Sequence, residues 1–337
     1  MTNWSKRWVY IAIGFISLSA LLSFFLPSGY ALNAFADLSQ TAILFGCYLS
    51  TLPNQTKSRG RAAGFWMLMG IGFALWLIAQ GLWACYEVML RKHVPDPFIG
   101  DIVLFMHVVP MLSALALQPH RTNERTLGVG LANAALMFVW FLSMYLYFVI
   151  PWQYVSPNKD IYDVAFDHMY AFGNLSFVTT AGVLWLQSSG EWKRFYTHWF
   201  AAGAMYAVGS YMASRAISAD VYYSGSFYDL LLSGAMLWYI GAGFIGLETS
   251  GQREAISTAQ VPVGMDGETW LSVAAVVSVF FIGTWGSFGS NAPADVRNFR
   301  FLTTCVATVI LGIVIVLKQQ LLRKADREGV SFVSAAQ

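Results

Sequence analysis

The feature that constrains this chain most is a series of long apolar runs along its whole length. A helix that crosses a bilayer needs about 20 mostly apolar residues. Ten runs meet this length, at 8–26, 34–52, 63–90, 99–118, 127–150, 164–187, 195–217, 227–247, 269–288 and 300–319. They are continuously apolar and do not alternate with a period of two, which disfavours barrel strands. The sequence therefore predicts an all-α, polytopic integral membrane helix bundle with about ten transmembrane helices.

The composition excludes an ordinary soluble protein. Only 11% of the 337 residues are charged and 57% are hydrophobic, whereas soluble domains are about 25% charged. The partner predicted for most of this surface is the lipid bilayer. The net charge of +2 is too small to indicate a nucleic-acid partner. The three cysteines lie within apolar runs without CxxC spacing, and we interpret them as small buried hydrophobic residues.

Basic residues predict the orientation, because short cytoplasmic loops are enriched in Lys and Arg. With ten spans, 14 of the 20 basic residues fall on one side, which places both termini in the cytoplasm. These are Lys6, Arg7, Lys57, Arg59, Arg61, Arg121, Arg125, Lys193, Arg194, Arg253, Lys318, Arg323, Lys324 and Arg327. The other side carries Arg91, Lys92, Lys159, Arg215, Arg297 and Arg300. The weakest run is the second, because Asp37 lies near its start.

The first run has a second interpretation. Lys6 and Arg7 precede 19 apolar residues, and Ala34-Phe35-Ala36 follows, as in a secretory signal peptide. Because the hydrophobic region of a signal peptide is usually about 7–15 residues long, we favour an uncleaved first helix.

One membrane domain accounts for nearly the whole chain. We assign residues 1–320 to a ten-helix membrane domain and residues 321–337 to a short cytoplasmic tail. The segment 249–268, rich in Gly, Ser and Thr, is interpreted as a cytoplasmic linker before the last two helices. A faint internal repeat relates 75–119 to 203–247, and it aligns Asp101 with Asp229.

Ionisable residues inside membrane spans are costly and mark functional sites. In the predicted spans they gather at the outer ends of five helices, with Gln80 and Asn174 deeper. We therefore predict a ligand-binding pocket open to the outer side, suited to a small amphipathic or zwitterionic ligand. Its predicted residues are Glu87, Asp101, His107, Asp167, His168, Arg215 and Asp229.

Three alternatives remain for these residues. Asp37, Asp101 and Asp229 each stand at a predicted helix start, where a carboxylate can cap backbone N–H groups. Arg215 can pair with Glu87, Asp229 or Asp220 and so bind helices together. His107 and His168 can serve as axial ligands of a haem or bind copper, although no CxxCH or HExxH motif is present. The favoured prediction includes no metal and no cofactor.

No catalytic motif occurs in the chain, so we do not predict an enzyme. The sequence contains no GxxxxGK[ST], no GxSxG, and no GxGxxG between a strand and a helix. Paired glycines such as Gly128 and Gly130 lie in apolar spans, where small residues allow close helix packing.

Several short passages resemble a known class of membrane region. They are Trp83–Tyr86, Pro95-Asp96-Pro97-Phe98-Ile99-Gly100-Asp101-Ile102-Val103-Leu104-Phe105 with Pro110, Gly225-Ser226-Phe227-Tyr228-Asp229-Leu230-Leu231, and Val316-Leu317-Lys318-Gln319-Gln320-Leu321-Leu322-Arg323. Together they resemble the N-terminal multi-helix membrane sensor regions of bacterial sensor histidine kinases and diguanylate cyclases. The resemblance implies a bacterial cytoplasmic (inner) membrane location and a helix that carries a signal out of the membrane.

The chain departs from this class after Leu322, because neither a heptad run nor a phospho-accepting histidine box nor a cyclase signature follows. A kinase or cyclase output domain is then either missing or encoded separately. The leading functional hypothesis is a membrane-embedded sensory and signalling module, of the kind found in two-component systems. It would act on a cytoplasmic signalling partner or as a homodimer. The alternatives are a small-solute transporter and a membrane subunit or cofactor carrier of a larger complex.

Overall fold

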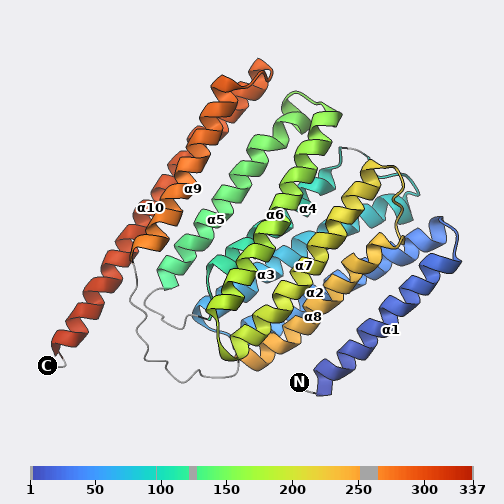
Figure 1. Ribbon diagram of the computed structural model, residues 1–337, viewed down its shortest axis with the longest axis horizontal. Helices are drawn as coiled ribbons and strands as arrows, with labels where there is room; N and C mark the ends of the chain where they lie inside the picture. The colour runs from blue at the N-terminus through green and yellow to red at the C-terminus, as the bar shows by residue number, and fades with distance from the viewer. Residues whose placement is uncertain (1–2, 96, 121–126, 251–264, 336–337) are drawn as a thin grey trace. The chain divides into compact units, whose positions relative to one another are not determined.

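The computed structural model describes residues 3–95, 97–120, 127–250 and 265–335, and every regular element within them is helical (Figure 1). This confirms the all-α prediction. The α-helices are α1 (Asn3–Phe25), α2 (Tyr30–Lys57), α3 (Gly60–Ala84), α4 (Ile99–Ala116), α5 (Leu127–Phe148), α6 (Lys159–Gln187), α7 (Gly190–Ser218), α8 (Tyr228–Ser250), α9 (Met265–Thr284) and α10 (Ala294–Ala335). Three π-helical turns, η1 (Cys85–Met89), η3 (Pro151–Val155) and η4 (Trp285–Gly289), follow α3, α5 and α9.

Seven helical segments within the described residues are long and apolar enough to cross a membrane. They are Arg7–Phe25, Gly60–Met89, Ile99–Ala116, Leu127–Val155, Lys159–Gln187, Tyr228–Glu248 and Ala294–Lys324. Helices α2 and α7 have 28 and 29 residues, which is sufficient length, but they carry more polar side chains. The polar residues of α2 include Asp37, which already made its run the weakest of the predicted spans.

The chain divides into two compact units that alternate along the sequence. The first unit contains Met1–Met111 and Tyr170–Gln252, and the second contains Leu112–Met169 and Arg253–Gln337. Helices α4 and α6 each contribute one part to either unit. Most of the residues predicted for the pocket belong to the first unit, whereas Asp167 and His168 belong to the second.

The first unit is built around α2, α3, α7 and α8, with α2 packed on α3 and α8 and α7 packed on α8. Small residues bring α2 and α8 close together: Asn54 Nδ2 donates to the Gly243 carbonyl at 2.9 Å. A side chain at Gly243 would collide with Ser50. Helix α1 packs on α8, where Trp8 Nε1 donates to the Leu237 carbonyl at 2.9 Å.

The second unit is organised by the packing of α5, α9 and α10. Tyr147 on α5 donates its hydroxyl to the Ile282 carbonyl at 2.6 Å, and the Arg300 guanidinium lies 4.9 Å from the centre of its ring. Arg300 Nε also donates to the Tyr147 carbonyl at 3.2 Å. These contacts place an arginine of α10 against an aromatic ring of α5, an arrangement that cation–π attraction stabilises.

One sequence interpretation is corrected here. Helix α2 begins at Tyr30, four residues before the predicted span, so Asp37 lies two turns inside the helix and does not cap its start. The residues of the predicted tail, 321–337, are helical through Ala335 and continue α10, which has 42 residues. The expected loops at 119–126 and 249–268 lie largely outside the described residues.

Candidate functional site

Three carboxyl groups meet in the first unit. Asp37 comes from α2, Glu87 from η1 and Asp229 from the first turn of α8. We call these residues the carboxyl cluster. Asp37 is only 2% exposed and Asp229 4%, whereas Glu87 is half-buried. The carboxyl group of Asp37 interacts electrostatically with those of both Glu87 and Asp229.

Asp229 is surrounded by hydrogen-bond donors. The backbone N–H of Gly225 donates to its Oδ2 at 2.7 Å, and the Tyr222 hydroxyl donates to its Oδ1 at 2.8 Å. The side chain of Gln40 also bonds to it. Hydrogen bonds of this kind favour the ionised form of a carboxyl group. These donors satisfy both carboxyl oxygens of Asp229, which therefore holds the turn before α8.

Asp37 and Glu87 have a different environment. Gln80 Nε2 lies 3.4 Å from Asp37 Oδ1, but neither Asp37 Oδ2 nor Glu87 Oε2 receives a donor, although both oxygens are buried. The two carboxyl groups lie within hydrogen-bonding reach of each other. Two buried carboxylates at this separation repel strongly, and a proton between them removes the repulsion. The pair can therefore hold one proton.

The cluster contains no basic partner. Within the described residues, none of the three carboxyl groups forms an ion pair with Lys, Arg or His. The expected pair between Arg215 and a carboxylate is likewise not formed in the described parts of the chain, and the Arg215 side chain is exposed. The buried positions on this part of α7 are Ala213 and Ala216, and Arg215 lies off that face.

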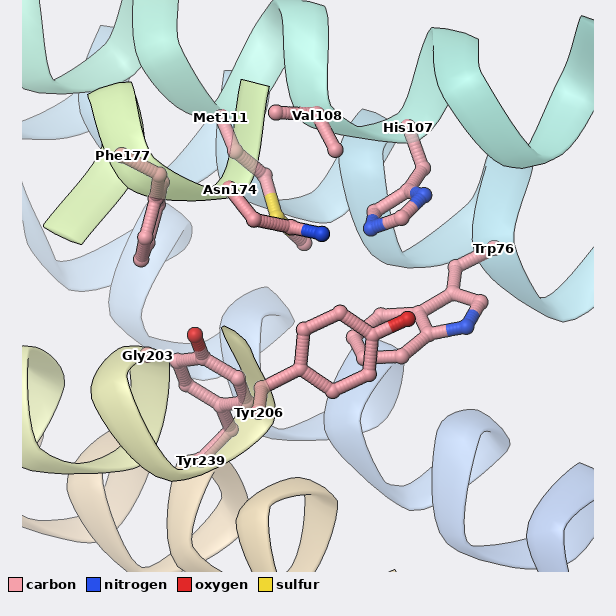
Figure 2. Close-up of a pocket in the computed structure, with 9 residues that line it drawn as sticks. All are labelled: Trp76, His107, Val108, Met111, Asn174, Phe177, Gly203, Tyr206 and Tyr239. Atoms are coloured by element: carbon pink, nitrogen blue, oxygen red, sulfur yellow. The ribbon is translucent and has the colours of Figure 1, made fainter. Parts of the chain in front are cut away.

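A second polar region, the histidine cavity, lies within the first unit, and Figure 2 shows the side chains that line it. His107 is 2% exposed, and its ring stacks on Trp76 with the ring centres 4.5 Å apart. Its Nδ1 bonds to the carbonyl of Leu104. The amide nitrogen of Asn174, which lines the same cavity, has no hydrogen-bond partner. The centre of a water molecule can move within about 10 Å³ of this cavity, so the cavity has room for about one water molecule.

Tyrosines surround this cavity. Tyr206 and Tyr239 line it, and the hydroxyl oxygens of Tyr170 and Tyr206 are 2.5 Å apart. Tyr206 also interacts electrostatically with Tyr222, which donates to Asp229. Tyr170 and Tyr206 thus form a pair of hydroxyl groups close to His107, whose ring centre lies 6.1 Å from that of Tyr170.

Beyond Tyr239 the first unit is closed by aromatic packing. The ring of Tyr239 lies 4.9 Å from that of Trp199, and Trp199 lies 6.0 Å from Trp66 between ring centres. Phe65, Trp66, Phe73, Phe195 and Trp199 are fully buried, and we call these five residues the aromatic layer. The aromatic layer lies towards the end of the unit where α3 and α7 begin, an end that also contains the buried polar side chains of Asn54 and Arg61.

A third region, the serine-lined cavity, adjoins Asp229. It lies among α1, α2, α8 and the turn before α8, with a volume of about 20 Å³ for the centre of a water-sized sphere. Its polar lining consists of Ser19, Ser23, Ser39, Gln40, Ser226, Asp229 and Ser233. Ser226 is 4% exposed, and its hydroxyl has no hydrogen-bond partner. The cavity is polar and large enough for one or two water molecules.

The remaining predicted site residues lie in other settings. Asp101 accepts the backbone N–H of Phe98 at 3.2 Å, so it caps the start of α4 as the alternative interpretation expected. His168 is exposed and bonds through Nδ1 to the Val164 carbonyl, and Asp167 precedes it on α6 in the second unit. Glu87, His107 and Asp229 are therefore the predicted residues that lie in or beside the polar interior of the first unit.

Sequence reasoning missed two contributors, Asp37 and Tyr222. Asp37 was assigned to a helix start because the apolar run begins at residue 34, and the four preceding residues gave no helical signal of their own. Tyr222 follows α7 in a segment without regular structure, where a sequence pattern does not indicate side-chain direction. The one available signal for Asp37 was its charge within an apolar run.

The described residues offer no evident metal centre. Among them, no three His, Cys, Asp or Glu side chains are grouped so as to hold a metal ion. The haem alternative gains no support beside His107, because the adjoining cavity has room for about one water molecule.

Comparison with known proteins returns no match to a family model, a curated protein or a solved structure. Function must therefore be argued from the site itself.

Proposed function

We propose that this chain is a membrane-embedded sensory module that responds to a stimulus from the outer side and relays it to the cytoplasm. The supporting observation is the carboxyl cluster itself, whose buried and half-buried acidic groups lie together at one end of α3. The carboxyl cluster lies where α3 ends and α8 begins, and the aromatic layer lies where α3 and α7 begin. Ionisable groups buried at a cost in membrane segments mark functional sites.

In the proposed topology the chain crosses a bacterial inner membrane ten times, with both termini in the cytoplasm. The helices α3, α5 and α9 then run outward, and each ends in a π-helical turn on the outer side. Single π-helical turns are frequent at functional sites. Glu87 belongs to one of these turns, which gives the proposed stimulus a local element to act on.

The proposed output element is α10. It continues for 42 residues, well beyond the roughly 20 residues that cross a bilayer. Leu321 packs near Gly128 at the start of α5, so the helix keeps contact with the second unit up to this point. A rigid helix that leaves the membrane can carry a small shift to a partner. The partner would be a histidine kinase or cyclase domain, or a second copy of the chain.

The composition of the site changes the expected ligand. A zwitterionic ligand was favoured because the predicted pocket contained Arg215 as well as carboxylates. In the structure Arg215 is exposed, and the cluster is acidic without a basic partner among the described residues. We therefore propose a cationic stimulus.

A small-solute transporter is the alternative. Transporters place their substrate site near the middle of the membrane, at discontinuous helices. The histidine cavity and the serine-lined cavity each have room for only one or two water molecules, which favours sensing over transport.

Site-to-helix coupling tests the proposal. Two spin labels are attached to cysteines placed at Ser58 and Gln320, in a background without native cysteines. We expect Glu87→Gln to shift the label-to-label distance distribution by about 1–2 Å or to change its populations, as helix shifts at interfaces do. The control is Glu191→Gln, which removes a carboxylate beside Arg194 at 3.3 Å and should leave the distribution unchanged. An unchanged distribution in Glu87→Gln and Asp37→Asn would contradict the relay.

A further inference from the structure

We propose that Asp37 and Glu87 form a proton-binding site, and that the proton is the cation to which the first unit responds. This inference rests on the proposed sensory function and specifies its ligand. It rests on two observations. Asp37 Oδ2 and Glu87 Oε2 are buried and have no hydrogen-bond donor, and the two carboxyl groups lie within hydrogen-bonding reach of each other. A proton shared between them supplies the missing donor to one and removes the charge of the other.

The surrounding groups divide the roles among the three carboxyl groups. Asp229 receives donors from Gly225, Tyr222 and Gln40, so each of its two oxygens has a hydrogen-bond partner without an added proton. Asp37 receives one long hydrogen bond from Gln80, and within the described residues the buried Oε2 of Glu87 has no donor. Pairs of carboxyl groups in unlike environments separate into one that keeps its proton and one that does not.

The groups that act on the pair are acidic or neutral. Asp229 on α8 and the Tyr222 hydroxyl act on both carboxyl groups, and Gln80 on α3 contributes a neutral amide. Arg91, which follows η1, lies 4.2 Å from the centre of the Tyr30 ring and forms no ion pair with a carboxylate of the described chain. A third negative charge nearby raises the cost of leaving the pair without a proton.

The available space excludes a larger cation in this conformation. The serine-lined cavity beside Asp229 has room for one or two water molecules, and it contains the unpartnered hydroxyl of Ser226. Water there can exchange protons with the cluster, but an organic amine does not fit. Glu87 is the half-buried member of the pair, so its side chain is the more accessible of the two.

Proton loss has a mechanical consequence. Without the proton, Asp37 on α2 and Glu87 on η1 are two like charges at hydrogen-bonding distance, and they push the two elements apart. With the proton, the hydrogen bond holds η1 against α2. The two elements are in contact, so the closed arrangement is the protonated one. This gives the site two arrangements whose populations depend on pH.

Infrared difference spectroscopy of the full chain in lipid nanodiscs tests the inference. We expect the wild type to show the carbonyl stretch of a protonated carboxyl group, which disappears as the pH is raised from about 5 to about 9. Asp37→Asn and Glu87→Gln should each remove this titrating band. Both changes replace a carboxyl group by an amide of the same shape, so the fold is retained. The control Asp220→Asn alters an exposed carboxyl group and should retain the band.

Three other results are informative. If the band is absent, or persists in both variants, the proton site is overturned. The sensory relay is then still tested separately by the spin-label distances. A band that is displaced by sodium chloride but not by choline chloride overturns it in favour of a metal cation. The band can titrate as expected while the distance between the labels at Ser58 and Gln320 does not change in Glu87→Gln. That result supports the proton site and contradicts the sensory relay.

Discussion

At the scale of single residues, two aspartate side chains of the carboxyl cluster have opposite effects on stability. Asp229 stabilises local structure, because its two oxygens accept Gly225 N–H and the Tyr222 hydroxyl. Asp37 lacks a donor at Oδ2 and destabilises the interior unless a proton or cation is bound. Stability measurements can separate these roles because isosteric amides remove the charge and keep the shape.

We predict that Asp229→Asn lowers the free energy of unfolding by about 2–3 kcal/mol, since the amide NH2 then faces a backbone donor and leaves it unsatisfied. Asp37→Asn should change it by less than about 1 kcal/mol at neutral pH. Thermal unfolding of both variants in detergent is the measurement. Equal losses in the two variants would contradict the assigned roles.

The site was predictable from sequence only in part. Glu87, His107 and Asp229 are identified by charge or polarity within apolar runs, because that signal does not depend on knowing the fold. The burial of Asp37 depends on where α2 begins, and the exposure of Arg215 depends on which face of α7 packs. Both depend on tertiary contacts, which no local pattern encodes.

At the scale of elements, the apolar runs predicted the existence of all ten helices but not all of their ends. Helix α10 outlasts its apolar run because Lys, Gln, Leu and Arg, which favour helix, follow Leu317 without a proline. The π-helical turns after α3, α5 and α9 were not predicted. They depend on one extra residue in a turn, which leaves no sequence signature.

One such turn provides a sharp test of packing. A Cβ at Gly286 in η4 would fall 1.4 Å from Tyr147 Oη, so the backbone approaches the tyrosine too closely for any side chain. We predict that Gly286→Ala lowers the free energy of unfolding by about 1–3 kcal/mol, as overpacking does. Gly312→Ala is the matched control, because no atom lies within 4 Å of its Cβ. Thermal unfolding checks both, and a neutral Gly286→Ala would contradict the described contact.

At the scale of the whole molecule, the proposed sensory function requires that the carboxyl cluster face the outer side of the membrane. We predict that cysteines at Ser58 and Ser189 resist an impermeant maleimide in intact cells, while a cysteine at Asn158 reacts. The reason is the excess of Lys and Arg in the loops that contain the first two positions. Labelling after permeabilisation shows that the protected sites are chemically competent. Reaction at Ser58 in intact cells would reverse the proposed orientation.

Access to the carboxyl cluster from one side of the membrane distinguishes a sensory site from a transport path. Glu87→Cys, in a background without native cysteines, is treated with an impermeant thiol reagent in right-side-out and inside-out vesicles. Because Glu87 is half-buried at the end of α3, and the aromatic layer lies at the opposite end of that helix, we predict labelling from the outside only. Labelling from both sides would contradict a sensory site closed to the cytoplasm and would favour a transport path.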